Sequence, residues 1–307
     1  MPSPADPPER TFRMLEFLTP SLYFSRAGGR PMKRFGQHFL AQPATAARIV
    51  EEAALSESDV AVEIGPGLGV LTRYILPAVR TLHLVEVDRE MADYLRERLP
   101  DNESAVLHEQ DVLSFDFGAL SRERGNRLVL LGNLPYNITS PLMFHLLDCF
   151  PAVDRAVFMV QKEVGERFAA GCGTKQYGVL SVLLGIYSRV SRLFSVGPRQ
   201  FYPPPKVDSL VLRIDFNEDG PGGLPFSFLR KFVSTAFQKR RKTLQNSLKG
   251  AFGLPFDILE DAFALNDLDP KRRPETLNPA EFLALTQAVY RKMHDFETLR
   301  DHSGNLL

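Results

Sequence analysis

Four consecutive residues, Asn133-Leu134-Pro135-Tyr136, combine groups that together can hold an aromatic amine. The lone pair of such an amine is delocalised into its ring, so two acceptors that grip its hydrogens are needed to aim the lone pair outward. The side-chain carbonyl of Asn133 offers one acceptor and the main-chain carbonyl of Leu134 the other, while Pro135 stiffens the turn. Tyr136 offers a flat face for base stacking, worth roughly 1–3 kcal/mol. These residues predict group transfer to a planar amine through positioning and electrostatics.

A glycine-rich loop, Gly65-Pro66-Gly67-Leu68-Gly69, follows directly after an apolar stretch that ends with Glu63-Ile64. Glycines at 65, 67 and 69 let a backbone approach a ligand closely, because no Cβ intervenes. The dinucleotide fingerprint places its third glycine one residue later, and the Glu63 carboxylate would repel a pyrophosphate. We therefore expect a cationic ligand, such as the α-amino group and sulfonium of S-adenosylmethionine. The alternative interpretation is a tight strand-to-helix turn without a ligand.

Three further acids lie where predicted strands end. Glu86 follows Gly65 by 21 residues and is expected to accept hydrogen bonds from ribose hydroxyls. Asp88 is better explained as the cap of the helix that begins at Arg89. Asp111, with its neighbour Val112, is expected at the adenine end of the cofactor, where the carboxylate would accept from the amino group; alternatively, Asp111 is a solvated loop acid.

Strand and helix patterns alternate along the middle of the chain. This alternation predicts an α/β fold with a parallel, doubly wound sheet and ligands at the carboxyl ends of its strands. The last two predicted strands flank a Pro-rich loop and are expected to form an antiparallel edge. The predicted strands are 60–64, 81–87, 105–108, 127–131, 155–160, 190–196 and 209–216, and the predicted helices between them are 45–54, a helix from about 70, 89–99 and 141–150.

Composition along the chain suggests four parts. Residues 1–31 are Pro-rich, with a short apolar patch at Met14 to Leu18, and we expect little order there; Met32 is a plausible alternative start. Residues 32–216 form the expected catalytic domain and 217–225 a linker. Residues 226–307 form an expected small helical domain with helices 226–248, 257–264 and 279–293.

Bulk properties exclude several classes of protein. The 307 residues are 44% hydrophobic and 24% charged, with a formal net charge of zero, which is ordinary for a soluble globular chain. The two cysteines, Cys149 and Cys172, form no CxxC motif and no HExxH motif occurs, so we expect neither a metal site nor a disulfide. No apolar run approaches the roughly 18 residues of a membrane helix. We expect a cytoplasmic monomer.

The segment between Gly220 and Phe256 is basic, although the chain as a whole is neutral. Four adjacent cations, Lys239, Arg240, Arg241 and Lys242, fall in a predicted helix, where phosphate contact is the obvious use. A solvated helix face is the alternative. A second basic set precedes the Pro-rich loop. The seven basic residues of the segment, which contains no acid, are Arg230, Lys231, Lys239, Arg240, Arg241, Lys242 and Lys249, and the second set is Arg189, Arg192 and Arg199.

Seven motifs in order give the chain a strong resemblance to the ribosomal RNA adenine N6-dimethyltransferase family, bacterial type, from about Lys33 to at least Arg273. The fold that this resemblance implies is a Rossmann-like class I S-adenosylmethionine-dependent methyltransferase with a small C-terminal helical domain. The motifs are Phe35-Gly-Gln-His-Phe-Leu40, Val62-Glu-Ile-Gly-Pro-Gly-Leu-Gly69, Val85-Glu-Val-Asp88, Gln110-Asp-Val112, Gly132-Asn-Leu-Pro-Tyr-Asn-Ile-Thr-Ser-Pro141, Phe201-Tyr-Pro-Pro-Pro-Lys-Val-Asp-Ser209 and Phe237-Gln-Lys-Arg-Arg-Lys-Thr-Leu244.

The resemblance implies cofactor contacts at six positions: His38, Leu40, Gly65, Glu86, Asp111 and Asn133. The chain departs from the family pattern at His38, where the family often has asparagine. Both side chains can form hydrogen bonds, but a protonated imidazole beside a sulfonium would be unfavourable. We therefore expect His38 to be neutral.

The implied substrate is a pair of adjacent adenosines in a hairpin near the 3′ end of small-subunit (16S) ribosomal RNA in a pre-30S particle, each converted to N6,N6-dimethyladenosine during ribosome biogenesis. The target adenine must be unpaired or flipped to reach Asn133. Phe201 is expected to stack on this base opposite Tyr136, or else to be a hydrophobic plug under the Pro-rich loop. Lys206 is expected to contact phosphate or to be a solvated charge.

Two other functions remain open. An erythromycin-resistance type methyltransferase, which acts on large-subunit RNA, would use the same Asn133 motif, although the segment from Phe201 to Ser209 and the basic stretch favour the small-subunit type. A non-catalytic RNA-binding or ribosome-assembly protein could retain the fold, but the intact cofactor and amine-binding motifs argue against pure binding.

Overall fold

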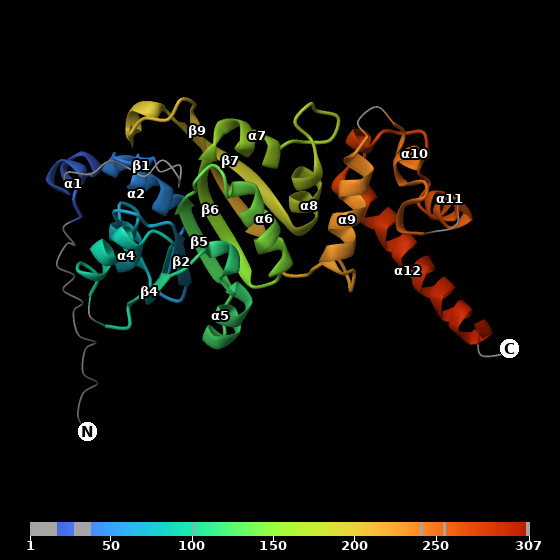
Figure 1. The fold of residues 1–307 in the computed structure, drawn as a ribbon, viewed down its shortest axis with the longest axis horizontal. Coiled ribbons are helices and arrows are strands. Elements are labelled where there is room, and N and C mark those ends of the chain that lie inside the picture. Colours follow the sequence, from blue (N-terminus) through green and yellow to red (C-terminus); the bar gives the residue numbers. More distant parts are fainter. Residues whose placement is uncertain (1–16, 28–37, 101, 240–241, 254–255, 305–307) are drawn as a thin grey trace, which may run out of the picture.

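A seven-stranded sheet forms the centre of the molecule in this computed structural model, which describes residues 17–27, 38–100, 102–239, 242–253 and 256–304 (Figure 1). The strand order is β4-β3-β2-β5-β6-β9-β7. The first five strands in this order are parallel, and β9 and β7 run antiparallel at one edge, which confirms the predicted doubly wound sheet with an antiparallel edge. The strands are β2 (Val60–Ile64), β3 (Thr81–Glu86), β4 (Ala105–Glu109), β5 (Leu128–Asn133), β6 (Val153–Gln161), β7 (Ser188–Val196) and β9 (Ser209–Phe216).

Helices cover both faces of the sheet because the central strands carry apolar residues on both faces. Along β2 and β5, Val62 and Leu130 belong to one buried cluster, whereas Ala61 and Val129 belong to another. The helices are α2 (Pro43–Glu52), α3 (Thr72–Ile75), α4 (Arg89–Arg96), α5 (Phe117–Arg124), α6 (Thr139–Asp148), α7 (Lys162–Phe168) and α8 (Val179–Tyr187). Helices α5, α7 and α8 are additions to the elements that the sequence predicts.

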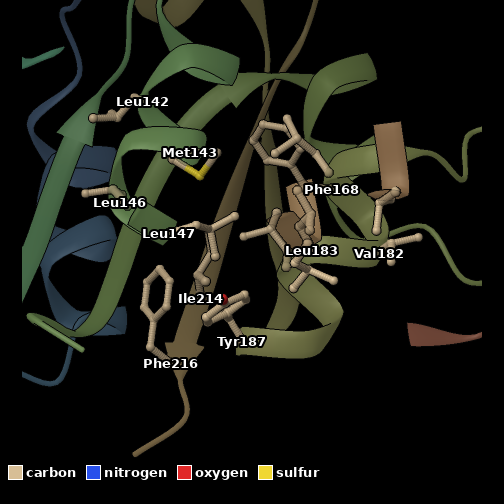
Figure 2. Packing of buried hydrophobic residues seen from close by; sticks show 14 of the residues in the cluster. Leu142, Met143, Leu146, Leu147, Phe168, Val182, Leu183, Tyr187, Ile214 and Phe216 are labelled. Atoms are coloured by element: carbon tan, nitrogen blue, oxygen red, sulfur yellow. The ribbon is translucent and has the colours of Figure 1, made fainter. Parts of the chain in front are cut away.

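The larger cluster lies between the sheet, α6 and α8 (Figure 2). Leu147 of α6 points toward Ile214 of β9, and Leu183 and Tyr187 of α8 complete the cluster. The same cluster continues into the C-terminal helices through Phe232 and Phe282, among other residues. The helical region is therefore packed on the catalytic domain through α8.

The C-terminal region contains α9 (Phe226–Phe237), α10 (Leu244–Leu248), α11 (Phe256–Leu265) and α12 (Pro279–Gly304). The prediction of one helix over 226–248 is wrong, because α9 ends at Phe237 and Thr243 caps a new helix by accepting from the Asn246 N–H. Lys239 and Lys242 therefore lie in the connection between two helices. Arg240 and Arg241 lie outside the described residues.

A short two-stranded ribbon and an N-terminal helix lie outside the seven-stranded sheet (Figure 1). Strand β1 (Phe39–Leu40) pairs antiparallel with β8 (Phe201–Tyr202), and α1 (Pro20–Ala27) lies beside β1. The structure differs here from the low order expected for residues 1–31. Residues 17–27 are folded, because their apolar side chains cover an apolar surface that includes Leu68, Met91 and Leu95. The remaining residues of that segment lie outside the described part.

Candidate active site

A cavity of about 380 Å³ opens where β2, β3 and β5 end, at the edge of the sheet where doubly wound folds bind ligands. Its size falls within the range of small-molecule sites. The glycine loop, the acids and the Asn133 segment all line it, although the chain separates them by as much as 70 residues. The predicted residues along its wall are His38, Leu40, Glu63, Gly65, Gly67, Glu86, Asp111, Val112, Asn133, Leu134, Pro135 and Tyr136.

The glycine loop has the backbone that only glycine adopts without strain. Gly65, Gly67 and Gly69 have φ angles of +63°, +54° and +75°. A Cβ on Gly65 would project into open space, whereas one on Gly67 would lie 2.9 Å from the ring of Phe39. Gly69 is not among the cavity-lining residues; its N–H donates to the Pro66 carbonyl and closes the turn. Gly69 therefore shapes the loop, and its contact with the cofactor stays a prediction.

Glu63 is 1% exposed at the base of the cavity. Its carboxylate accepts a hydrogen bond of 2.6 Å from the Thr72 hydroxyl. Burial raises the pKa of Glu63 to about 8, and the nearby Glu86 carboxylate adds to this rise. A cation in the cavity would favour the ionised form, which is the behaviour expected of a group that recognises an ammonium or sulfonium.

Glu86 connects the end of β3 to the glycine loop. One of its carboxylate oxygens accepts from the Gly67 N–H at 3.0 Å and the other from the Asp88 N–H at 2.9 Å. Burial raises the pKa of this carboxyl, and the two backbone donors oppose the rise. Each oxygen retains a second lone pair, so the carboxylate can still accept from two ribose hydroxyls. Asp88 caps α4 by accepting from the Glu90 N–H, as predicted.

Asp111 and Val112 form the wall at the end of β4. Asp111 is exposed, and its Oδ1 accepts from the Leu113 N–H at 2.9 Å, which fixes the direction of the carboxylate. Val112 is 5% exposed and presents an apolar surface. The pair combines an acceptor with an apolar face, as an adenine ring and its amino group require.

Asn133 is the last residue of β5, and His38, which lies 95 positions earlier in the sequence, orients its side chain. Its Nδ2 donates to the main-chain carbonyl of His38 at 2.8 Å. Because the amide nitrogen is engaged in this bond, Oδ1 is left as the acceptor on the other arm of the amide. His38 is held in turn by a 2.8 Å bond between Nδ1 and the Pro203 carbonyl. A carbonyl can only accept, so Nδ1 carries a hydrogen.

The turn after Asn133 is fixed on both sides. The Leu134 N–H donates to the Met159 carbonyl of β6 at 3.0 Å, and the Pro135 carbonyl accepts from the Ile138 N–H and the Thr139 hydroxyl. The Tyr136 ring lies 5.6 Å from the His38 ring, and both line the cavity. Burial raises the pKa of the Tyr136 hydroxyl, and nearby Ser209 opposes the rise. Tyr136 is thus placed beside Asn133 as a partly exposed flat ring.

Phe201 does not have the position that base stacking requires. It is 5% exposed and belongs to the hydrophobic cluster that also contains Leu40, its cross-strand partner in β1. Its ring is outside the set that lines the cavity. The stacking role predicted for Phe201 is therefore unsupported, because strand pairing turns its side chain into the core; the structure places it as the alternative, a plug.

The basic residues lie outside the cavity. Lys206, Lys239 and Lys242 are all exposed, as are the three arginines of the second set along and after β7. Among the described residues, no group of three metal-ligating side chains lies together, and no helix has the length and apolarity needed to cross a bilayer. The cations predicted to bind RNA are thus available on the surface, outside the cavity.

Several cavity residues were missed by sequence reasoning. Val87 and Gln110 line the wall beside Glu86 and Asp111, and their proximity in sequence to these acids was the available signal. The second group is the run from Phe17 to Pro20. The apolar patch ending at Leu18 was the signal, but a sequence gives no hint of the surface that such a patch will cover.

Sheet order, glycine loop and acids at the strand ends together define a class I S-adenosylmethionine-dependent methyltransferase fold. The chain matches the family model for ribosomal RNA adenine dimethylase over residues 30–284. It is 44% identical to "Ribosomal RNA small subunit methyltransferase A" of Syntrophotalea carbinolica, over 85% of this chain and 97% of that protein. It is 45% identical to the protein of the same name from Laribacter hongkongensis, over 83% and 95% of the two chains. The chain belongs to the ribosomal RNA adenine dimethylase family.

Solved structures agree with this assignment. A dimethyladenosine transferase from Plasmodium falciparum superposes with a TM-score of 0.71 and 26% identity, over 81% of this chain and 96% of that one. The 23S rRNA methyltransferase ErmE superposes with a TM-score of 0.63 and 24% identity, over 82% and 99%. The likeness to ErmE shows a common fold alone, so the fold does not distinguish small-subunit from large-subunit substrates.

Proposed function

We propose that this chain transfers methyl groups from S-adenosylmethionine to N6 of two adjacent adenosines near the 3′ end of small-subunit ribosomal RNA, giving N6,N6-dimethyladenosine. Membership of the adenine dimethylase family and the names of the bacterial relatives support this substrate. The observation within the site that carries the proposal is the bond from Asn133 Nδ2 to the His38 carbonyl, because it leaves Oδ1 to accept from an amine.

The residues of the cavity suit this cofactor. Among the residues that the structure describes, the carboxylates of Glu63, Glu86 and Asp111 line it, together with the guanidinium of Arg73. Glu63 would attract the positively charged methionine part, Glu86 would hold the ribose, and Asp111 with Val112 would hold the adenine. The cofactor supplies a methyl group activated by its sulfonium charge.

Asn133 and Leu134 prepare the acceptor amine. The Asn133 Oδ1 accepts one N6 hydrogen and the Leu134 carbonyl accepts the other, which favours a pyramidal nitrogen with its lone pair directed away from both. The Pro135 carbonyl is already engaged by two donors, so it does not compete for the amine. Tyr136 stacks on the flipped base, and the amine proton leaves after transfer, so no strong base is required.

Exposed cations outside the cavity would hold the RNA backbone. Lys206 lies on the loop after β8, and Lys239 and Lys242 lie between α9 and α10; Arg240 and Arg241 belong to the same run of sequence. We further infer that the protein acts as a monomer, in the cytoplasm, on pre-30S particles, where duplex segments around the target supply phosphates for these contacts.

Product analysis of wild-type protein and Asn133→Ala tests the proposal. Small-subunit particles that lack the modification are incubated with labelled S-adenosylmethionine, and the digested RNA is analysed for methylated nucleosides. We expect N6,N6-dimethyladenosine from the wild type. The alanine variant should bind cofactor within about an order of magnitude of the wild type but lose most of its turnover, because only the amine grip is removed. Unchanged turnover would show that Asn133 does not hold the amine. Label on another base would show that adenine N6 is not the methyl acceptor.

A further inference from the structure

The segment from Phe17 to Ala27 precedes the part of the chain that matches the family model, which begins at residue 30. Four of its residues, Phe17, Leu18, Thr19 and Pro20, nevertheless line the cofactor cavity. The Phe17 ring packs against Gly69 of the glycine loop, and Phe17 and Leu18 pack with the cluster that contains Leu68. The cavity therefore has one wall that the shared family region does not supply.

Two hydrogen bonds attach this segment to α4, the helix that follows Glu86. The Leu18 N–H donates to the Tyr94 hydroxyl at 2.8 Å, and the Tyr23 hydroxyl donates to Glu90 at 2.7 Å. The Tyr94 ring is 6% exposed and also meets the Tyr23 ring edge-on at 5.1 Å between centroids. The segment thus has specific partners at both ends of its contact with the catalytic domain.

Phe24 is the apolar anchor of α1. It is 6% exposed and packs with Leu68 of the glycine loop and Met91 of α4. Its ring lies 5.5 Å from that of Phe39 and is stacked at 6.0 Å on that of Tyr202. Phe39 and Tyr202 are cross-strand partners in the β1–β8 ribbon. The helix therefore braces the ribbon beside His38 and Pro203, which orient Asn133.

Gly69 provides the space that the segment occupies. A Cβ at this position would lie 2.4 Å from the Phe17 ring, so a side chain here would displace Phe17. Gly69 does not itself line the cavity, but the Phe17 ring that packs against it does. The glycine loop and the N-terminal segment are therefore complementary in shape.

We propose that residues 17–27 form a cover over the cofactor cavity that slows the departure of S-adenosylmethionine and S-adenosylhomocysteine. Phe17 to Pro20 exclude water from the cavity, while Phe24 and the two hydrogen bonds hold the cover in place. Burial of apolar surface by a preformed wall lowers the dissociation rate more than it changes the association rate. This inference rests on the proposed use of the cavity as a cofactor site.

The test measures the binding and dissociation of S-adenosylhomocysteine in four proteins: the wild type, a deletion of residues 2–27, Phe17→Ala and Leu22→Ala. Leu22 belongs to the same segment, on α1, but is 40% exposed, so it serves as the matched control. We expect the deletion to raise the Kd about tenfold or more, mainly through a faster dissociation rate, and Phe17→Ala to give a smaller rise of the same kind. Leu22→Ala should resemble the wild type.

Tyr94→Phe tests the same proposal if the deletion variant does not fold. This substitution removes the hydroxyl that accepts from the Leu18 N–H and preserves the ring. We expect it to accelerate dissociation with little change in unfolding temperature. Unchanged dissociation in Phe17→Ala and Tyr94→Phe, or tighter binding after the deletion, would overturn the cover. Asp111→Ala separates the two proposals: if it leaves binding intact, the assignment of the cavity to the cofactor fails, whatever the cover does.

Discussion

At the scale of residues, the site depends on which atom of each polar group is already engaged. The Asn133 amide can present either its nitrogen or its oxygen to a ligand. Because the nitrogen donates to the His38 carbonyl, the oxygen is the atom left for the ligand. The two backbone donors that Glu86 accepts fix its carboxylate in the same way. The sequence could identify these residue types, but it could not reveal the contact between positions 38 and 133.

The raised pKa of Glu63 predicts that stability and cofactor affinity depend on pH. Its pKa of about 8 in the folded protein lies above its ordinary value, so the folded state keeps a proton that the unfolded state has already lost. Stability is therefore greatest below the unfolded pKa and falls as the pH rises toward 8, and a cation that favours the ionised form binds more tightly over the same rise. We expect the affinity for S-adenosylmethionine to increase between about pH 6 and pH 8.

Calorimetry of wild-type protein and Glu63→Gln across this range measures the effect. Glutamine can still accept from the Thr72 hydroxyl but cannot ionise, so the variant should bind more weakly at pH 8 and lose most of the pH dependence. It should also be more stable than the wild type at alkaline pH. A wild-type affinity that does not change with pH, or a variant with the same profile, would refute the charge role of Glu63.

At the scale of elements, the carboxyl ends of β2 and β5 must lie close together for the site to form. Gly132 pairs with Ile64, and a Cβ on it would lie 2.7 Å from the Ile64 carbonyl oxygen. Gly132→Ala should therefore separate the strands and displace Asn133. We expect a destabilisation of about 1–3 kcal/mol, seen as a lower unfolding temperature, together with a loss of methyl transfer.

Gly171→Ala is the matched control for this substitution, because a Cβ there meets nothing within 4 Å. It should leave both unfolding temperature and methyl transfer close to the wild type. If Gly132→Ala behaved like this control, the close strand approach would not be what positions Asn133.

The elements also show how far the sequence could predict the fold. Strands with apolar residues on both faces, such as Val60–Ile64, are recognisable because their composition reflects burial on two sides. Helix α8 was missed because its residues are almost uniformly apolar, without the polar face that reveals a helix. The break between α9 and α10 was missed because the Thr243 cap lies inside a pattern that otherwise continues.

The exposed lysines between α9 and α10 are predicted to strengthen RNA binding and to increase its salt dependence. Lys239 and Lys242 are exposed there, and neutralising both should release fewer counterions when RNA binds. The double substitution to glutamine should weaken binding and make its salt dependence shallower by about one to two in slope, measured by titration at several salt concentrations. Lys271→Gln, an exposed lysine outside the acid-free segment, is the control; a slope unchanged by the double substitution would show that these lysines do not contact phosphates.

At the scale of the whole molecule, the sheet and the N-terminal segment meet around the cavity, and the C-terminal helices lie away from it. The sheet carries the glycine loop, the acids and Asn133, the N-terminal segment adds a wall to the cavity, and the C-terminal helices pack through α8 on the far side of the larger core. The exposed lysines proposed to bind RNA, Lys206, Lys239 and Lys242, lie outside the cavity. The chemistry is therefore set by the sheet, whereas the choice of RNA depends on surfaces at its margins.

Methyl transfer to small-subunit particles compared with large-subunit RNA tests the central claim most directly. Both substrates, unmethylated, are offered with labelled S-adenosylmethionine, and the modified adenosines are mapped along each RNA. We expect label on two adjacent adenosines near the 3′ end of small-subunit RNA, with little on the large-subunit RNA. Label confined to the large-subunit RNA would contradict the proposed function and support the erythromycin-resistance type of activity instead.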